Sequence, residues 1–77
     1  MTVTARDWIE QFAAKLGTAA PTEEEQSELL QLAGAAAHAS ERTAAPISCW
    51  LVARAGVGPA AGTRAAVELA DQISAEG

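Results

Sequence analysis

Residues 22–41 read TEEEQSELLQLAGAAAHASE. Thr22 stands three residues before Glu25, the spacing of a capping box, in which each side chain satisfies a backbone N–H group at the start of a helix. Leucines and alanines then recur on one arc of a helical wheel, while His38 falls on the opposite face. This pattern predicts a long amphipathic helix over about 23–41, and that helix decides the fold.

Three further helices are predicted on either side of this one. An amphipathic stretch at about 5–16 is followed by Gly17, which suits the left-handed position that ends a helix. Pro46 fits the first turn of a short helix at about 46–55, since proline loses no hydrogen bond there. Another helix follows at about 59–74. No segment alternates apolar and polar residues as a strand does, so we expect an all-α, compact four-helix domain with a short apolar third helix.

The size and composition of the chain limit its core. Seventy-seven residues allow one small helical domain, residues 1–77, and a chain of this length buries only about 60% of its unfolded surface. Although 49% of the residues are hydrophobic, alanine supplies most of that fraction and fills little volume. The helices therefore either approach closely through small residues or gain buried area by association with a partner or with a second copy, as a homo-oligomer.

Charge and cysteine content exclude several classes of protein. The net charge of −5 disfavours nonspecific binding to nucleic acid and to anionic membranes. The N-terminus has no basic region followed by an apolar run, so we expect no signal peptide. The apolar stretch at 44–57 is interrupted by Arg54 and is too short to span a bilayer. One cysteine and one histidine form neither an intrachain disulfide nor a zinc site. We expect a cytoplasmic protein with no membrane contact, no metal and no cofactor.

Two cationic residues near the end of the predicted 23–41 helix form a candidate binding site. His38 and Arg42 are four residues apart, so their side chains can converge on one anion such as a phosphate or a carboxylate. A purely structural role is the alternative, because cations at the C-terminus of a helix meet the negative end of its dipole.

The two tryptophans are the bulkiest apolar groups of the chain. Trp8 lies on the apolar arc of the predicted 5–16 helix, and we expect it in the core. Trp50 lies away from the Ile47 and Leu51 side of the 46–55 helix, which is apolar nearly all round. A core position is expected for Trp50 too, with a partner-binding anchor as the alternative, because tryptophan is enriched at binding hot spots. The candidate anion- or partner-binding residues are therefore His38, Arg42 and Trp50.

Other reactive side chains lack the partners that catalysis or metal binding requires. Cys49 has no base held next to it, and a cysteine on an apolar helix is usually inert filler. The glutamates at 23–28 are explained by the positive dipole at a helix N-terminus and do not require a metal. We expect no catalytic residue.

The segment 52–64, VARAGVGPAAGTR, provides an alternative function. Its glycine-containing turn is similar to that of a helix-turn-helix unit, which would direct Thr63 and Arg64 toward DNA bases. Against this, Arg64 is the single cation of the would-be recognition helix, and the chain is acidic. A small DNA-binding regulator is the alternative to an interaction module.

Several short motifs together resemble one family. They are Trp8-Ile9, Ala37-His38, Ser40-Glu41-Arg42, Ala45-Pro46 and Trp50-Leu51-Val52. In this order they resemble a small actinobacterial-type helical domain of unknown function, found alone or fused to molybdenum cofactor guanylyltransferase. Stand-alone members carry the label of molybdopterin-guanine dinucleotide biosynthesis proteins. The chain departs from the family pattern at Thr43, where proline is expected, and at Trp50, where phenylalanine is usual.

The resemblance implies an association with molybdenum cofactor biosynthesis and suggests the guanylyltransferase as a partner. A guanylyltransferase itself needs an α/β nucleotide-binding domain with a glycine-rich phosphate loop, and 77 helical residues contain neither. We therefore expect a non-catalytic accessory or interaction module rather than an enzyme.

Overall fold

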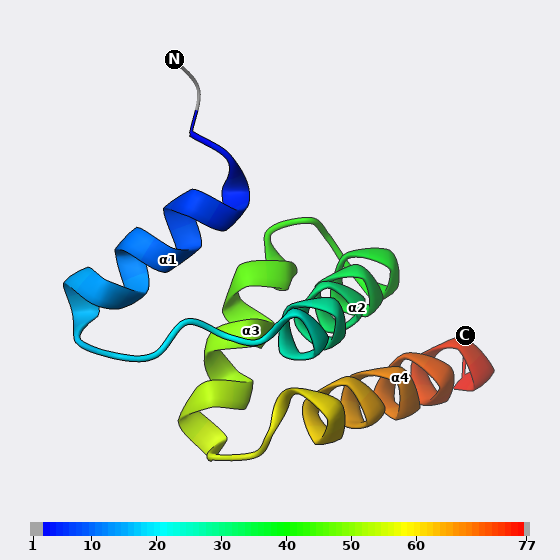
Figure 1. Ribbon diagram of the computed structural model, residues 1–77. Helices are drawn as coiled ribbons and strands as arrows, with labels where there is room; N and C mark the ends of the chain where they lie inside the picture. The colour runs from blue at the N-terminus through cyan, green and yellow to red at the C-terminus, as the bar shows by residue number, and fades with distance from the viewer. Residues whose placement is uncertain (1–2, 77) are drawn as a thin grey trace.

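The protein consists of four helices. The computed structural model describes residues 3–76, so residues 1, 2 and 77 of the expected 1–77 domain lie outside the described residues. The helices are α1 (Ala5–Leu16), α2 (Glu23–Ala39), α3 (Ala44–Ala55) and α4 (Pro59–Glu76), and no strand occurs between residues 3 and 76 (Figure 1). This confirms the predicted all-α fold. None of these helices is long and apolar enough to cross a membrane.

Helix α2 is the centre of the packing, in contact with both α3 and α4. Figure 1 shows α4 lying alongside α2, with α3 across them. The two long helices run in the same direction. Thr63 near the start of α4 donates to the Glu28 carbonyl near the start of α2, and His38 near the end of α2 lines the same hollow as Ser74 near the end of α4. Leu32, in the middle of α2, is only 1% exposed and is the one large side chain among the described residues that is fully buried.

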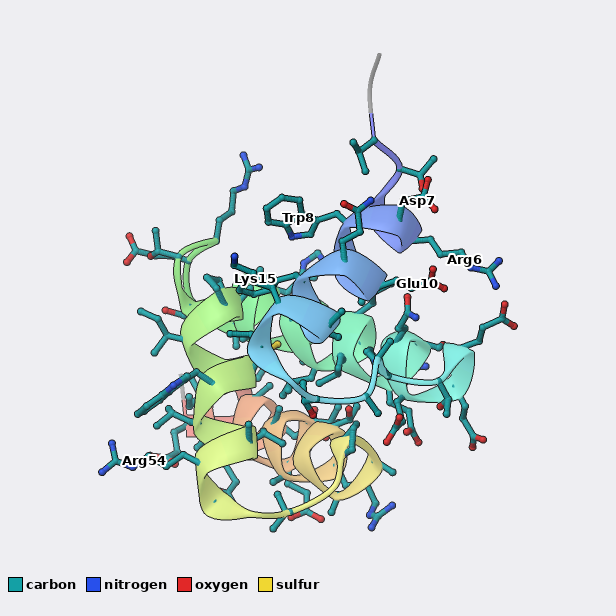
Figure 2. All side chains as sticks on the ribbon, turned by 60° about the vertical axis from the view of Figure 1, so that its left-hand side comes forward. Arg6, Asp7, Trp8, Glu10, Lys15 and Arg54 are labelled. Carbon is teal, nitrogen blue, oxygen red and sulfur yellow. The ribbon has the colours of Figure 1, made fainter. Side chains whose placement is uncertain are left out.

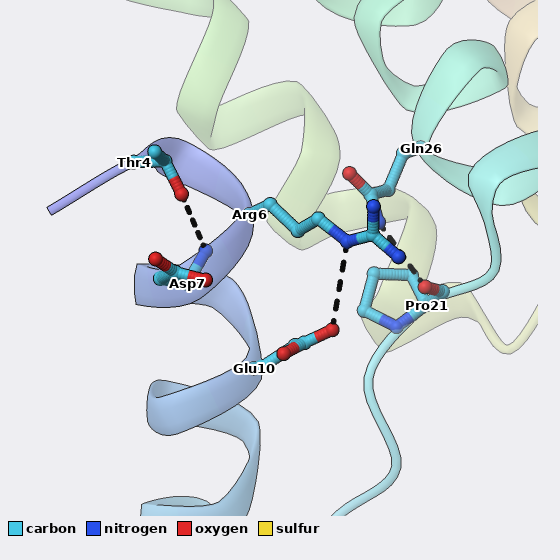
Figure 3. A network of polar contacts seen from close by, with 6 residues as sticks. All are labelled: Thr4, Arg6, Asp7, Glu10, Pro21 and Gln26. Carbon is cyan, nitrogen blue, oxygen red and sulfur yellow. Dashed lines mark hydrogen bonds and ion pairs between the residues drawn. The ribbon is translucent and has the colours of Figure 1, made fainter.

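Helix α1 lies apart from the other three. Among residues 3–76, its backbone makes no close approach to α2, α3 or α4. Residues 17–22 connect it to α2, and the Gln26 side-chain amide donates to the Pro21 carbonyl at 3.2 Å (Figure 3). The position of α1 therefore depends on a short linker and on side-chain contacts.

The helix starts agree with the capping motifs in the sequence. The Asp7 N–H donates to the Thr4 hydroxyl at 3.1 Å, as Figure 3 shows. Thr22 and Glu25 form the complete capping box, with reciprocal bonds of 2.9 and 3.0 Å. Gly17 adopts the left-handed conformation at φ 79°, which ends α1 at the predicted residue.

The junction between α2 and α3 differs from the prediction. Helix α2 ends at Ala39, two residues before the expected end, because Ser40 leaves the helical conformation at φ −141° and ψ −104°. Helix α3 begins at Ala44, two residues early. Pro46 is thus the third residue of α3 and still lies in the first turn, where a backbone N–H has no intrahelical acceptor and its absence costs no hydrogen bond. Helix α4 continues to Glu76, past the predicted end at residue 74.

Replacing Thr22 with alanine tests the contribution of the capping box. The substitution removes the hydroxyl that accepts from the Glu25 N–H, and we expect a loss of about 1 kcal/mol in the free energy of unfolding. Urea denaturation followed by circular dichroism measures this change. Thr18→Ala, in the linker, is the matched control and should have little effect. An equal loss in both variants would contradict a role for the capping box.

Candidate functional site

The three residues of the candidate binding site lie on three successive segments of the chain. His38 is in the last turn of α2, whereas Arg42 lies in the turn that follows. The helical spacing that would bring the two side chains together is absent, because α2 ends at Ala39. The prediction that both residues belong to the end of one helix is wrong. Anion binding by this pair stays a prediction, without its helical basis.

His38 lies beside a hollow between α2 and α4. The hollow has a volume of about 440 Å³ and is open to solvent. His38 enters it from α2, and Asp71 and Ser74 enter it from α4. These three polar side chains make the lining of the hollow partly polar, whereas the exposed surfaces of α1 and α3 are apolar.

Trp50 is exposed on the outer face of α3, contrary to the expected core position. Its side chain is 56% exposed, and the Arg54 guanidinium lies 5.0 Å from the centre of the ring. Ile47 and Leu51 are exposed as well, at 60% and 54%. Residues three apart are neighbours on a helix surface, so Trp50 lies next to Ile47, and the expectation that it lies away from the Ile47 and Leu51 side is wrong. We call Ile47, Trp50 and Leu51 the α3 stripe. The sequence correctly placed these residues on an apolar helix, but none of them faces α2.

A second apolar row is exposed on α1. Trp8 stacks on Phe12, with ring centres 5.7 Å apart, yet Trp8 is 61% exposed. The expected core position of Trp8 is therefore wrong. Leu16 continues the row one turn further on, at 63% exposure. We call Trp8, Phe12 and Leu16 the α1 stripe. Large apolar side chains grouped in this way are typical of interaction surfaces.

One edge of the apolar arc of α1, the edge that contains Ile9, faces the rest of the molecule. An apolar groove of about 370 Å³ separates α1 from α2 and α3. Its lining residues are Ala5, Ile9, Pro21, Gln26, Leu29, Leu30, Ala33 and Cys49. The Cys49 thiol lies 4.0 Å from the Leu29 carbonyl oxygen, half-buried against α2. Helix α1 thus uses one row of its apolar arc, with Ile9, for the groove and leaves the α1 stripe in solvent.

The titratable side chains do not form a reactive pair in the described part of the chain. Cys49 lines the groove beside α1, whereas His38 lines the hollow between α2 and α4. Residues 3–76 also contain no group of three or more histidine, cysteine or acidic side chains that could hold a metal ion.

The proposed DNA-reading residue Thr63 faces the interior of the fold. Its hydroxyl lies 2.8 Å from the carbonyl oxygens of Glu28 and Pro59, to which it donates. The expectation that Thr63 points toward DNA bases is therefore wrong for this fold. Arg64, the next residue, is exposed. DNA binding itself stays a prediction.

These features define a small all-α domain with two exposed apolar stripes. The chain belongs to a family described as a domain of unknown function (DUF6457), whose model matches residues 2–76. No curated protein and no solved structure matches the chain. The family match confirms the resemblance at the level of a domain of unknown function.

Proposed function

We propose that this domain is a non-catalytic interaction module that binds another protein through the α3 stripe. The observation that supports this proposal most strongly is the exposure of Trp50, with Arg54 stacked on its ring. Tryptophan and arginine are the residue types most enriched among binding hot spots, where burial of a large rigid side chain supplies much of the affinity. Ile47 and Leu51 beside them provide the apolar surroundings that exclude water from such a contact.

The separation of the reactive groups supports a non-catalytic role. A nucleophilic cysteine requires a base within hydrogen-bond reach, and the Cys49 thiol instead lies near a backbone carbonyl oxygen. The polar side chains around His38 occupy an open hollow, where water screens their charges.

The proposed partner is molybdenum cofactor guanylyltransferase in the cytoplasm. The support is the series of motifs from Trp8-Ile9 to Trp50-Leu51-Val52, which resembles a domain that occurs fused to that enzyme. A domain found fused to an enzyme in some proteins is well suited to bind the same enzyme as a separate chain in others, since fusion replaces an intermolecular contact with a high effective concentration.

Trp50→Ala tests this proposal. We expect the purified domain to bind immobilised guanylyltransferase and the variant to bind at least about 30-fold more weakly, the factor that corresponds to a loss of about 2 kcal/mol at a hot spot. Titration calorimetry measures both affinities. Val67→Ala is the control, because Val67 is an exposed apolar residue of α4 outside both stripes.

Two results would contradict the proposal. The wild-type domain could fail to bind the enzyme at low salt, or Trp50→Ala could bind as tightly as the Val67→Ala control. Retention of DNA by the wild-type domain in a gel shift at low salt would support the regulator instead.

A further inference from the structure

The α1 stripe lacks a partner within the described chain, and its residues follow a regular spacing. Trp8, Phe12 and Leu16 are four residues apart, so they form one continuous ridge along α1. Each is at least 47% exposed. In Figure 2 the labelled side chains Arg6, Asp7 and Glu10 extend from one side of α1, whereas Trp8 and Lys15 extend from the other. The ridge is therefore separated from most of the charge of the helix.

We propose that a second copy of this chain covers the α1 stripe, with the two α1 helices crossing antiparallel at Phe12. This inference goes beyond the proposed function, which uses the α3 stripe. A symmetric dimer requires a patch that is complementary to itself. A two-fold axis next to Phe12 lets each ridge lie in the groove beside the other ridge. The two Phe12 side chains are then adjacent, and each Trp8 lies near Leu16 of the second copy, because both are four residues from Phe12.

The spacing of the ridge suits this crossing. Ridges formed by every fourth residue pack into the grooves of a second such helix, which is the commonest helix–helix geometry in globular proteins. The crossing also joins one bulky ring, Trp8, to one smaller side chain, Leu16, at each end. Trp8 of one copy and Trp8 of the other therefore do not compete for the same space.

The charge distribution permits association of two acidic chains. Each copy carries a net charge of −5, but α1 itself is neutral, because Arg6 and Lys15 balance Asp7 and Glu10. The Arg6 guanidinium lies 3.7 Å from the Glu10 carboxylate, so this pair is balanced within the helix (Figure 3). The glutamates at 23–28, which carry much of the negative charge, belong to α2. Pairing through α1 therefore brings no excess of like charge together.

The exposed area is large enough for such a contact. The chain exposes 6049 Å² of surface, whereas a folded monomer of 7.9 kDa is expected to expose about 4,400 Å². A standard interface removes about 800 Å² from each partner, so an excess of about 1,600 Å² accommodates a second copy and leaves area for another protein.

The test is the molar mass of the protein in solution. We expect sedimentation equilibrium to give twice the chain mass of 7.9 kDa for the wild type. Phe12→Glu should weaken dimerisation at least about 100-fold, because the substitution places two carboxylates at the two-fold axis. Gln11→Glu is the matched control, since it adds the same charge to the neighbouring exposed residue, and it should remain dimeric. Trp50→Ala should remain dimeric as well.

Hydrogen exchange of the wild type provides a measurement that does not depend on a variant. Protection of the α1 amides should rise with protein concentration, while protection of the α2 amides around Leu32 should change little. A single-chain mass at millimolar concentration would overturn the inference. It would also be overturned by a dimer that withstands Phe12→Glu but dissociates with Trp50→Ala, because the α3 stripe would then be the contact.

Discussion

Leu32→Ala is expected to destabilise the domain more than any other single truncation of an apolar side chain. Leu32 is 1% exposed in the middle of α2, the helix that contacts both α3 and α4. Replacing a fully buried leucine with alanine costs about 2 to 5 kcal/mol, since the side chain loses its burial and leaves a cavity. A domain of this size has only about 4 to 11 kcal/mol of stability in total. The thermal midpoint should therefore fall by at least about 10 °C.

Leu30→Ala is the matched control for this substitution. Leu30 lies on the same helix two residues away, and it is 73% exposed. Its replacement should change the free energy of unfolding by no more than about 0.5 kcal/mol. Thermal unfolding followed by circular dichroism at a single protein concentration compares the two variants. Equal losses at both positions would mean that Leu32 is not the centre of the core.

The helix ends that sequence predicts best are those with local chemistry. Thr4 and Thr22 precede their first helical turns with a side chain that caps the backbone, and Gly17 and Gly56 end their helices in the left-handed conformation. These features depend on a few neighbouring residues, so a short stretch of sequence contains them completely.

The α2–α3 junction lacks such a signal, and this is why the sequence predicts the end of α2 too late. Residues 40–43 contain no glycine or proline, so the sequence gives little reason to end α2 before Arg42. The structure instead forms a tight turn, in which the Ala44 and Ala45 N–H groups donate to Glu41 and Arg42. Pro46 was compatible with either start of α3, since its missing donor is tolerated anywhere in the first turn.

The exposed stripes show a different limit of sequence analysis. Periodicity identifies which arc of a helix is apolar, but it does not say whether the chain itself covers that arc. Only part of the apolar arc of α1 lines the groove, so Ile9 is half-buried while Trp8 is exposed. The amino-acid composition did indicate that some large apolar side chains would remain exposed. A chain with so many alanines has few large side chains to cover one another, and association was accordingly one of its two expected solutions.

Gly62→Ala should have the opposite effect on stability from Gly34→Ala, although both place alanine in a helix. Gly62 is buried where α4 meets α3, and a Cβ atom there would lie 2.7 Å from both γ carbons of Val52. A valine side chain has little rotational freedom in a helix, so the helices must separate. We expect a net loss of about 1 to 3 kcal/mol, despite the better helix propensity of alanine.

Gly34→Ala measures the effect of the higher helix propensity of alanine without a steric clash. A Cβ atom at Gly34 meets no atom within 4 Å, so alanine there should stabilise α2 by about 0.5 to 1 kcal/mol. Urea denaturation measures both variants, and a double-mutant cycle with Val52→Ala identifies the cause. With the γ carbons of Val52 removed, Gly62→Ala should lose most of its cost, since the two changes are coupled through a single contact. A cost at Gly62 that persists in the Val52→Ala background would show that the close approach of α3 and α4 at this residue does not cause the loss.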